Sequence, residues 1–494
     1  MPIILCLSTI LLIGWAGSAA AQDPSPAEVA NPSSTLVLPS SGEGEAGSAS
    51  QPAPTNRACD GCPERRVGHA LLQSAAYINT IYGLANLIRG QDTAKITPKT
   101  WWANMKNGWE WDLDDFVVNQ FGHPYQGNNY FNAGRANGLS FWESAGITAL
   151  GSGTWEFFGE TNQASLNDLL NTTLGGIALG EMFHRTAWLV RDTRKSGRGR
   201  LMSEIGATVL DPVTGLNRFI SGDASRVSEM PPELVPSSLT GYLSAGALWR
   251  GDESTGHLTE SASPFAELDM LYGDITKGRS REPYEAFVVR LRLGGGFAFS
   301  EARVRGRLMG QPTVKGHLQI NVSQAYDFQK NNAYDFGAQS FEVSVSRDWA
   351  LSKRATVSLS GWGGLTALGA VDSVGVPGKE SESETPQQGE SIEPRHYDYG
   401  PGSDFGGSAV FSRNNRIFAV VFYQAHHLYV VDGPRANHLL QQGRIDLLAP
   451  LKGPLGVGVS GEYFDRHTFF QGPDDVVTKL HFPQVRIYLT WRMS

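Results

Sequence analysis

The sequence predicts an α+β protein in which an N-terminal helical module precedes an antiparallel, outer-membrane-type β-barrel of about twelve strands. After about residue 238, the spacing of apolar residues changes from the helical period to a period of two. The chain also begins with a secretory-type segment. A secreted chain that alternates in this way can enter a membrane as a closed barrel.

The segment at the start of the chain resembles a signal peptide. An apolar stretch from Ile3 to Trp15 is followed by three alanines that end at Ala21, a small-residue cleavage pattern. We therefore expect residues 1–21 to be removed on export.

Residues 22–66 are rich in Pro, Ser and Gly, and we expect a disordered leader because so few large apolar groups cannot offset the entropy of ordering. Near its end lies "CDGC", in which Cys59 and Cys62 are expected to form a local disulfide in an oxidising compartment. A zinc site would need further ligands, and the mature sequence has no second cysteine pair.

The helical module is expected over residues 67–230. Apolar residues recur at helical spacing in four segments, which are 67–89, about 132–158, 164–190 and 201–210. Ser165 is an expected N-cap with Asp168 three residues later, and Pro212 ends the last segment.

The barrel is expected over residues 231–494. In "LQINVS", Leu318, Ile320 and Val322 alternate with polar residues, as in a strand with one apolar face. Twelve such segments are expected at 239–249, 264–273, 286–294, 297–309, 315–328, 338–350, 354–366, 406–413, 416–430, 438–448, 454–467 and 479–493. An acidic insertion at 372–404 is expected to be an extracellular loop. The alternative is a soluble sandwich or lipid-binding barrel whose apolar faces turn inward.

Five arginines alternate with small or apolar residues in neighbouring strands, so they share one side. They are Arg290, Arg292, Arg303, Arg305 and Arg307. If that side is the lumen, this basic patch requires anionic partners, for which the carboxylates of the helical module are candidates. A solvated row of charges is the alternative.

Several charged residues of the helical module lie among apolar or small residues, so we expect a polar network between helices. Its expected members are Arg135, Glu160, Asn167, Asp168, Glu181 and Arg185. Glu181 and Arg185 have the i,i+4 spacing of a helical ion pair. Glu143, in "FWESAG", is expected to join this network through Arg135 or His123.

An enzymatic role is not favoured. His123, Ser140, Glu143 and Glu156 are the residue types of a nucleophile, base and orienting acid, but no G-x-S-x-G elbow is present. His123 with Glu156 and Glu160 is weak evidence for a metal site, because one histidine and two acids are too few. No metal or cofactor is therefore assigned.

Several motifs appear in order: "NQFGHPYQGNNYFNAGRANGLSFWES", "GSGTWEFFGE", "SLNDLLNTTLGGIALGE" and "GLNRFISGD". Over residues 100–225 the chain resembles the bacterial family known as domain of unknown function 3943. The resemblance implies an envelope-associated protein of Gram-negative bacteria and assigns no role to any residue.

We therefore expect an outer-membrane protein whose helices plug the lumen or cap its periplasmic mouth, with a structural, gating or lipid-related role. The expected partners are membrane lipid or lipopolysaccharide and the barrel-assembly machinery. The formal charge of −8 argues against nucleic acid. The alternatives are an outer-membrane lipid-modifying hydrolase and a soluble periplasmic lipid-binding protein.

Overall fold

The computed structural model describes residues 63–251, 257–258, 261–276, 278–313, 318–373, 397–414, 416–471 and 476–493. The predicted signal peptide, nearly all of the predicted leader and the predicted Cys59–Cys62 disulfide lie outside these ranges.

The helical module contains α-helices interrupted by short π-helical and 3-10 turns. These elements are α2 (Val67–Leu72), η1 (Gln73–Ile78), α3 (Asn79–Ile88), η2 (Asp92–Ala94), α4 (Pro98–Asn107), η3 (Val118–Gly122), α5 (His123–Ala136), α6 (Phe141–Phe158), α7 (Leu166–Leu170), η4 (Asn171–Gly175), α8 (Gly176–Val190), α9 (Gly197–Leu210), α10 (Pro212–Ser221) and η5 (Pro232–Leu234). No helix in the described ranges has both the length and the hydropathy of a membrane-crossing segment.

The segment predicted as one helix over 132–158 is two helices. A tight turn separates α5 from α6, and Gly138 occupies the left-handed region there, with φ of 71°. Ser140 then caps α6 by accepting a hydrogen bond from the Glu143 backbone N–H. The prediction was wrong here because the apolar pattern continues across this short turn.

Helices α5 and α8 approach each other closely because glycines face each other at their contact. A Cβ on Gly127 would lie 1.8 Å from the carbonyl oxygen of Thr172 and 2.8 Å from the Cα of Gly176. Gly180 likewise lies against the ring of Phe131. Small residues that let two backbones meet are a packing device of helices in membranes as well as in water.

The β-barrel is closed and antiparallel, which confirms the predicted fold class. Its strands are β1 (Leu239–Arg250), β2 (Ser263–Tyr272), β3 (Phe287–Gly294), β4 (Phe297–Pro312), β5 (Gln319–Lys330), β6 (Asp335–Ser352), β7 (Ala355–Asp372), β8 (Tyr397–Arg413), β9 (Arg416–Tyr429), β10 (Ala436–Pro450), β11 (Leu455–Phe470) and β12 (Val477–Met493). Each strand pairs with the next, and β1 closes the ring on β12, with Gly241 opposite Met493.

The acidic insertion is shorter than predicted. Strand β7 continues to Asp372 and β8 begins at Tyr397, so residues 397–404 belong to the wall and not to a loop. The segment "YDYGPGSD" was mistaken for a loop because its Gly and Pro residues are typical of turns.

The two faces of the wall are identified by contacts that cross the barrel. Arg292 of β3 pairs with Glu462 of β11, and these strands are not neighbours, so both side chains point into the lumen. Successive residues of a strand alternate in direction, so the residues next to these point outward. On the outer face, large apolar side chains such as Phe341, Val343 and Val345 are exposed.

The helical module packs against the outward face of the wall. In β5, Asp327 points into the lumen and pairs with Arg305, whereas the adjacent Tyr326 donates a hydrogen bond to the backbone oxygen of Gln120 in η3 at 2.7 Å. Gln324, on the same side as Tyr326, donates to the backbone oxygen of Leu174 in η4 at 2.8 Å. The module therefore lies on the outer wall of the barrel, whereas we expected it inside the lumen or across its periplasmic mouth.

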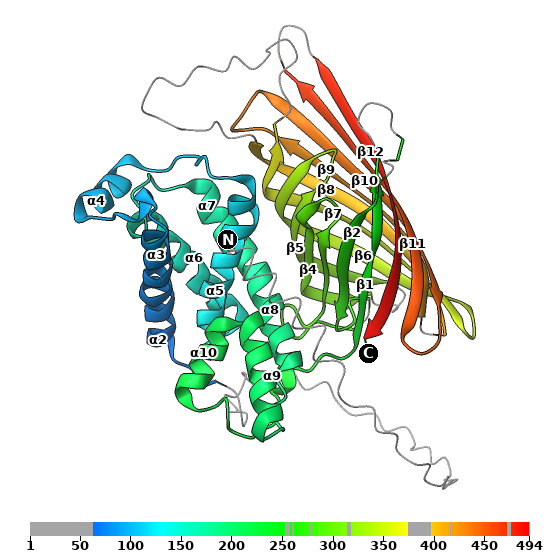
Figure 1. Ribbon diagram of the computed structural model, residues 1–494, viewed down its shortest axis with the longest axis horizontal. Helices are drawn as coiled ribbons and strands as arrows, with labels where there is room; N and C mark the ends of the chain where they lie inside the picture. Colours follow the sequence, from blue (N-terminus) through cyan, green and yellow to red (C-terminus); the bar gives the residue numbers. More distant parts are fainter. Residues whose placement is uncertain are drawn as a thin grey trace, which may run out of the picture. The chain divides into compact units, whose positions relative to one another are not determined.

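The module contacts the barrel wall from one rim to the other. The hydroxyl of Tyr272, at the end of β2, donates to the backbone oxygen of Leu234. Tyr397, at the start of β8, accepts a hydrogen bond from Asn119. Strands β2 and β8 run in the same direction, so these two tyrosines lie at opposite rims. One hydrophobic cluster joins α8 to strands β2–β5, β7 and β8, and Figure 1 shows α8 beside this side of the barrel.

Candidate functional site

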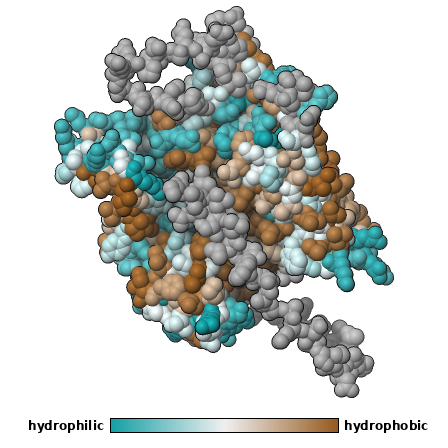
Figure 2. Space-filling model, in the orientation of Figure 1, coloured by the Kyte–Doolittle hydropathy of each residue, from teal (hydrophilic) through white to brown (hydrophobic). Residues whose placement is uncertain are grey.

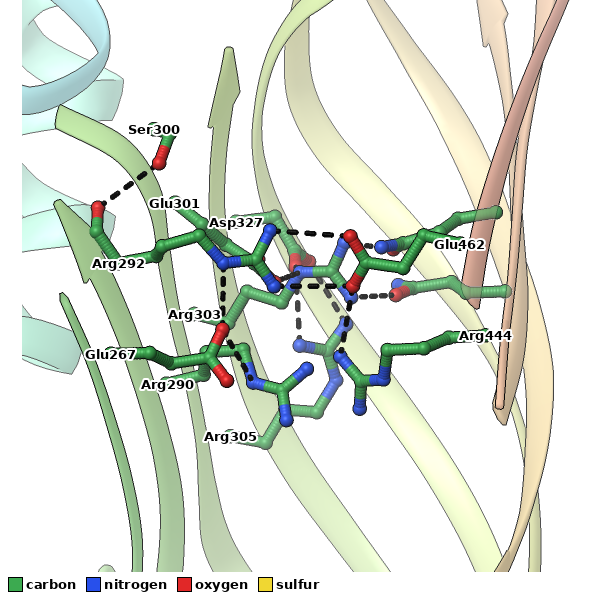
Figure 3. Close-up of polar contacts among 12 residues, drawn as sticks. Glu267, Arg290, Arg292, Ser300, Glu301, Arg303, Arg305, Asp327, Arg444 and Glu462 are labelled. Carbon is green, nitrogen blue, oxygen red and sulfur yellow. Dashed lines mark hydrogen bonds and ion pairs between the residues drawn. The ribbon is translucent and has the colours of Figure 1, made fainter. Parts of the chain in front are cut away.

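The lumen is occupied by a network of ion pairs between strands, here called the lumen network (Figure 3). Arg292 contacts Glu267 at 2.6 Å and Glu462 at 3.1 Å. Arg486 contacts the same two carboxylates at 2.7 and 3.1 Å. Two arginines and two glutamates from β2, β3, β11 and β12 therefore tie together the region where the ring closes.

The network continues along β4 and β5. Arg303 contacts Glu301 at 3.0 Å, and Arg305 contacts Asp327 at 3.0 Å. Arg303 also donates hydrogen bonds to Gln424 and Gln442 on the far wall. The contacts of Arg303 with the two glutamines join the two sides of the barrel, as does the Arg292–Glu462 pair that Figure 3 labels.

The five predicted arginines lie on the predicted face, but their partners differ from those expected. Arg290 pairs with Asp269 at 2.6 Å, and Arg307 pairs with Glu285 at 2.8 Å. The carboxylates that neutralise the basic patch thus come from the barrel and its β2–β3 loop, and not from the helical module. Period-two spacing in "FAELDML" would have revealed Glu267 and Asp269, whereas the cross-barrel partner Glu462 gives no local signal.

The lumen network leaves little open space around its centre. Arg292, Glu301 and Gln484 line a cavity of only about 10 Å³, roughly the size of one water molecule. Buried ion pairs of this kind fix side chains in place, because removing one partner leaves an uncompensated charge. Around these residues, the ion pairs therefore hold the side chains of opposite walls in fixed positions.

The interior of the helical module is unusually polar. Asn119, Asn128, Asn132 and Asn171 are fully buried there. The structure also brings three predicted members of the polar network together, because Glu181 contacts Arg185 at 2.7 Å and Arg135 at 3.0 Å. Helices that hydrogen-bond one another through buried polar groups in this way are typical of packing in an apolar surrounding.

Four further side chains meet where α5, α6 and α7 come together, and they are called the histidine–carboxylate cluster. They are His123, Glu156, Glu160 and Asp168. One carboxylate oxygen from each acid lies within 4.8 Å of the others, and His123 Nε2 lies 3.6 Å from Asp168 Oδ1. Asp114 lies at the edge of the cluster, 4.0 Å from the same nitrogen.

The electrostatics of this cluster are strongly perturbed. Burial raises the pKa of Asp168 to about 7 and that of Glu160 to about 8. Burial also raises the pKa of Glu156 well above its ordinary value. For His123, burial alone lowers the pKa, but the negative charge of Asp168 and the contact with the Asp114 carboxylate outweigh it and raise the pKa to about 10. The acids therefore repel one another and attract positive charge.

Hydrogen bonds from Ser165 and Asn167 hold two acids of the cluster in place. The Ser165 backbone N–H donates to Glu156 Oε2 at 2.8 Å, and the Ser165 hydroxyl caps α7 at Asp168. Asn167 donates to Asp168 Oδ1 at 2.9 Å and to Asp112 Oδ1 at 3.0 Å. The predicted N-cap at Ser165 thus orients two of the acids.

Glu143 is not in a buried network, contrary to expectation. Its side chain is 41% exposed, contacts Arg65 at 2.5 Å and forms a capping box with Ser140. Glu143 and Glu156 lie on one helix, 13 residues and about 20 Å apart along its axis. The four weak catalytic candidates therefore divide into an exposed pair, Ser140 with Glu143, and a buried pair, His123 with Glu156.

An apolar groove lies between α3, α4 and α6 of the module. Its volume is about 510 Å³, within the range of small-molecule sites. Leu84, Leu87, Ile96, Trp101 and Phe158 are among the residues that line it.

A closed antiparallel barrel with a charged lumen and an apolar outer face defines an outer-membrane-type β-barrel protein, here joined to a helical module. Residues 108–213 match the family described as "Domain of unknown function (DUF3943)", which confirms the resemblance seen in the sequence. No curated protein matches the chain.

Solved outer-membrane barrels align with about half of this chain. The NanC porin has 9% identity and a TM-score of 0.26, with 50% of this chain and 98% of that chain covered. The OmpT of Vibrio cholerae has 10% identity and a TM-score of 0.22, with 52% and 97% covered. The outer membrane protease OmpT from Escherichia coli has 7% identity and a TM-score of 0.18, with 52% and 97% covered.

Proposed function

We propose that this protein is a non-conducting outer-membrane barrel whose helical module contacts membrane lipid beside the barrel wall. The observation that carries the proposal is that the module buries many polar side chains and leaves many large apolar side chains exposed. A surface helix of a soluble domain turns its apolar stripe toward the core. Contact with lipid removes the apolar surface from water.

Many large apolar side chains of the module are exposed. On α3, Ile81, Leu84 and Ile88 are exposed, and Ile88 is 86% exposed. On α10, Ile220 is 84% exposed. Single exposed apolar residues are ordinary, but successive ones along two helices form a surface. Figure 2 shows hydrophobic residues at the surface of the module and of the barrel wall.

The module is attached to the face of the barrel that a membrane would cover. The module packs on outward-facing residues such as Tyr326 and Val304, and beyond them on the same wall Phe341 and Val343 are exposed. A barrel in a membrane presents an apolar band to lipid. A module attached to that band along the height of the wall therefore lies at the level of the acyl chains.

The groove between α3, α4 and α6 supports a specific contact with lipid. Its volume and apolar lining fit an acyl chain, and Asn79 and Thr154 are polar groups on its wall. We therefore propose a lipid or lipopolysaccharide acyl chain as its occupant. This assigns a lipid-related role and makes plugging or gating of the lumen by the helices the alternative.

The first test is fractionation together with heat-modifiable electrophoretic mobility. We expect recovery in the outer membrane and a mobility shift on boiling, as for a folded barrel. Recovery in the soluble periplasm with no shift would contradict the proposal and support the soluble lipid-binding alternative.

The second test measures whether the module meets lipid. In a Cys59→Ser, Cys62→Ser background, spin labels are placed by Ile88→Cys and Ile220→Cys, with Lys195→Cys in the α8–α9 loop as the control. In liposomes the first two labels should collide more with oxygen, which concentrates in lipid, and the control more with a water-soluble nickel complex. Equal nickel accessibility at all three sites would contradict lipid contact.

The third test is conductance in planar bilayers. The ion pairs that cross the lumen predict no steady ion current from the wild-type protein. Regular open and closed events would instead support the gating alternative.

A fourth test addresses the hydrolase alternative. If the protein is no enzyme, cells that express His123→Ala, with the barrel assembled normally, should have the same lipid profile as cells that express the wild type.

A further inference from the structure

The histidine–carboxylate cluster concentrates ligand atoms in a buried place. Glu156 is fully buried, and its Oε2 accepts a hydrogen bond from the Ser165 backbone N–H. Glu160 and Asp168 each bring one carboxylate oxygen within 4.8 Å of the Glu156 ligand atom. Three acids this close repel one another unless protons or a cation neutralise them.

Buried polar atoms of the cluster without hydrogen-bond partners indicate that a ligand is missing. Within the described ranges, neither ring nitrogen of His123 has a hydrogen-bond partner, although its side chain is only 9% exposed. Its Nε2 faces the acids, 3.6 Å from Asp168 Oδ1 and 4.0 Å from Asp114 Oδ2, so a bound ion would take the place of the proton that the acids favour on this nitrogen. Glu156 Oε1 has no hydrogen-bond partner among the described residues, and Glu156 is fully buried. Buried polar atoms normally have partners, so Glu156 Oε1 points to a missing ligand.

We propose that the histidine–carboxylate cluster binds one divalent cation. The three carboxylate oxygens would surround the ion, His123 Nε2 beside Asp168 would approach it as a fourth ligand, and water would complete its coordination. Carboxylate ligands suit Mn²⁺, Ca²⁺ and Mg²⁺, while imidazole suits Zn²⁺ and Fe²⁺, so a mixed set favours Mn²⁺, Fe²⁺ or Zn²⁺ over Ca²⁺. Ser165 and Asn167 donate hydrogen bonds to Glu156 and Asp168 and so orient these two ligands.

The ligands come from three elements, so the ion would join them. His123 begins α5, Glu156 lies in the last turn of α6, and Asp168 lies in α7. Tyr399 of the barrel accepts hydrogen bonds from Gln120 in η3 and from Asn167 next to Asp168. Binding would therefore stabilise the side of the module that meets the barrel.

The test uses the full chain, purified in detergent and stripped of metal with a chelator. Titration with Mn²⁺ followed by electron paramagnetic resonance should show about one tightly bound ion per chain. Pulsed measurement of the bound Mn²⁺ should detect one coupled nitrogen, which only His123 supplies in the cluster. The melting temperature should rise with Mn²⁺, because an ion that binds only the folded state stabilises it.

Glu156→Gln and Asp168→Asn should each weaken Mn²⁺ binding by about tenfold or more. Glu143→Gln is the matched control, because it makes the same chemical change on the same helix outside the cluster, and it should bind like the wild type. If the two variants fail to show the boiling shift of a folded barrel, the wild-type stoichiometry and nitrogen signal decide the matter. No tight Mn²⁺, no nitrogen coupling, or undiminished binding in folded Glu156→Gln would overturn the proposal.

Discussion

Glu181 lies between two arginines in the interior of the helical module. Burial alone raises the pKa of Glu181, but Arg135 and Arg185 outweigh it, and the pKa falls below its ordinary value. The carboxylate is therefore charged, and its charge is what permits two arginines to be buried beside it.

Glu181→Gln should strongly destabilise the module, because it leaves Arg135 and Arg185 with excess buried charge. We expect a loss of about 3–5 kcal/mol in the free energy of unfolding. Chemical unfolding in detergent, followed by circular dichroism at a helical wavelength, measures the change. A loss as small as that of an exposed substitution such as Lys195→Gln would contradict this role.

Glu143 stabilises the folded state to an extent that depends on pH. Hydrogen bonds from the Ser140 backbone N–H, from Arg65 and from the Ser140 hydroxyl lower the pKa of Glu143 from 4.5 to about 2. Because the folded state has the lower pKa, the stabilisation is complete above pH 4.5 and is lost as the pH falls towards 2.

Glu143→Ala should therefore loosen the start of α6 at neutral pH by about 0.5–1 kcal/mol, the usual effect of losing a helix cap. Hydrogen exchange at the first turn of α6 measures it, and the difference from wild type should shrink as pH falls from 4.5 to 2. A difference that is constant across this range would contradict the capping role of the carboxylate.

The residue scale is where sequence reasoning was least complete. The i,i+4 pair of Glu181 and Arg185 was predictable because helix geometry sets its distance. The partner of Glu143 was not, because Arg65 lies 78 residues away in the chain. The sequence placed His123, Glu156 and Glu160 in one hypothesis, but Asp168 joins them only through the turn between α6 and α7.

At the scale of elements, glycines set how closely the helices approach. Gly127 on α5 and Gly176 on α8 leave no room for a Cβ, whereas Gly146 on α6 faces open space. The same substitution should therefore have opposite effects at these positions.

Gly127→Ala should destabilise the module by about 1–3 kcal/mol, because the added methyl overlaps the Thr172 carbonyl. Gly146→Ala should stabilise α6 by up to about 1 kcal/mol, because alanine favours the helix and meets nothing. Thermal unfolding of both variants in the same detergent tests this, and destabilisation of similar size in both would show that the close contact is not responsible.

The strands were more predictable than the helix ends. All twelve predicted segments overlap strands of the barrel, because alternation with a period of two continues through each of them. The start of β8 was missed because Gly400, Pro401 and Gly402 interrupt the pattern. Tyr397 and Tyr399 nevertheless belong to the wall, since both contact the helical module.

At the scale of the whole molecule, the lumen network joins strands that are far apart in sequence. Glu462 contacts both Arg292 and Arg486, so one carboxylate serves strands β3 and β12. Its partners were not predictable from the sequence, because neither barrel size nor strand tilt is encoded in local spacing.

Glu462→Ala should lower the temperature at which the folded mobility is lost on heating, because two buried arginines lose a partner. We expect a loss of about 3–5 kcal/mol. Arg354→Ala, in the exposed turn between β6 and β7, is the control and should leave that temperature unchanged. Equal temperatures for the wild type and Glu462→Ala would show that the network does not hold the barrel together.

The position of the helices on the outer wall has a consequence for biogenesis. The module contacts residues of β2–β5, β7 and β8, whereas the seam pairs residues 241–250 of β1 with residues 484–493 of β12, at the two ends of the barrel sequence. Helices, which emerge first during synthesis, can thus serve as a template on which an open sheet forms. The last strands remain free to complete the ring, so docking and closure need not compete for the same edge.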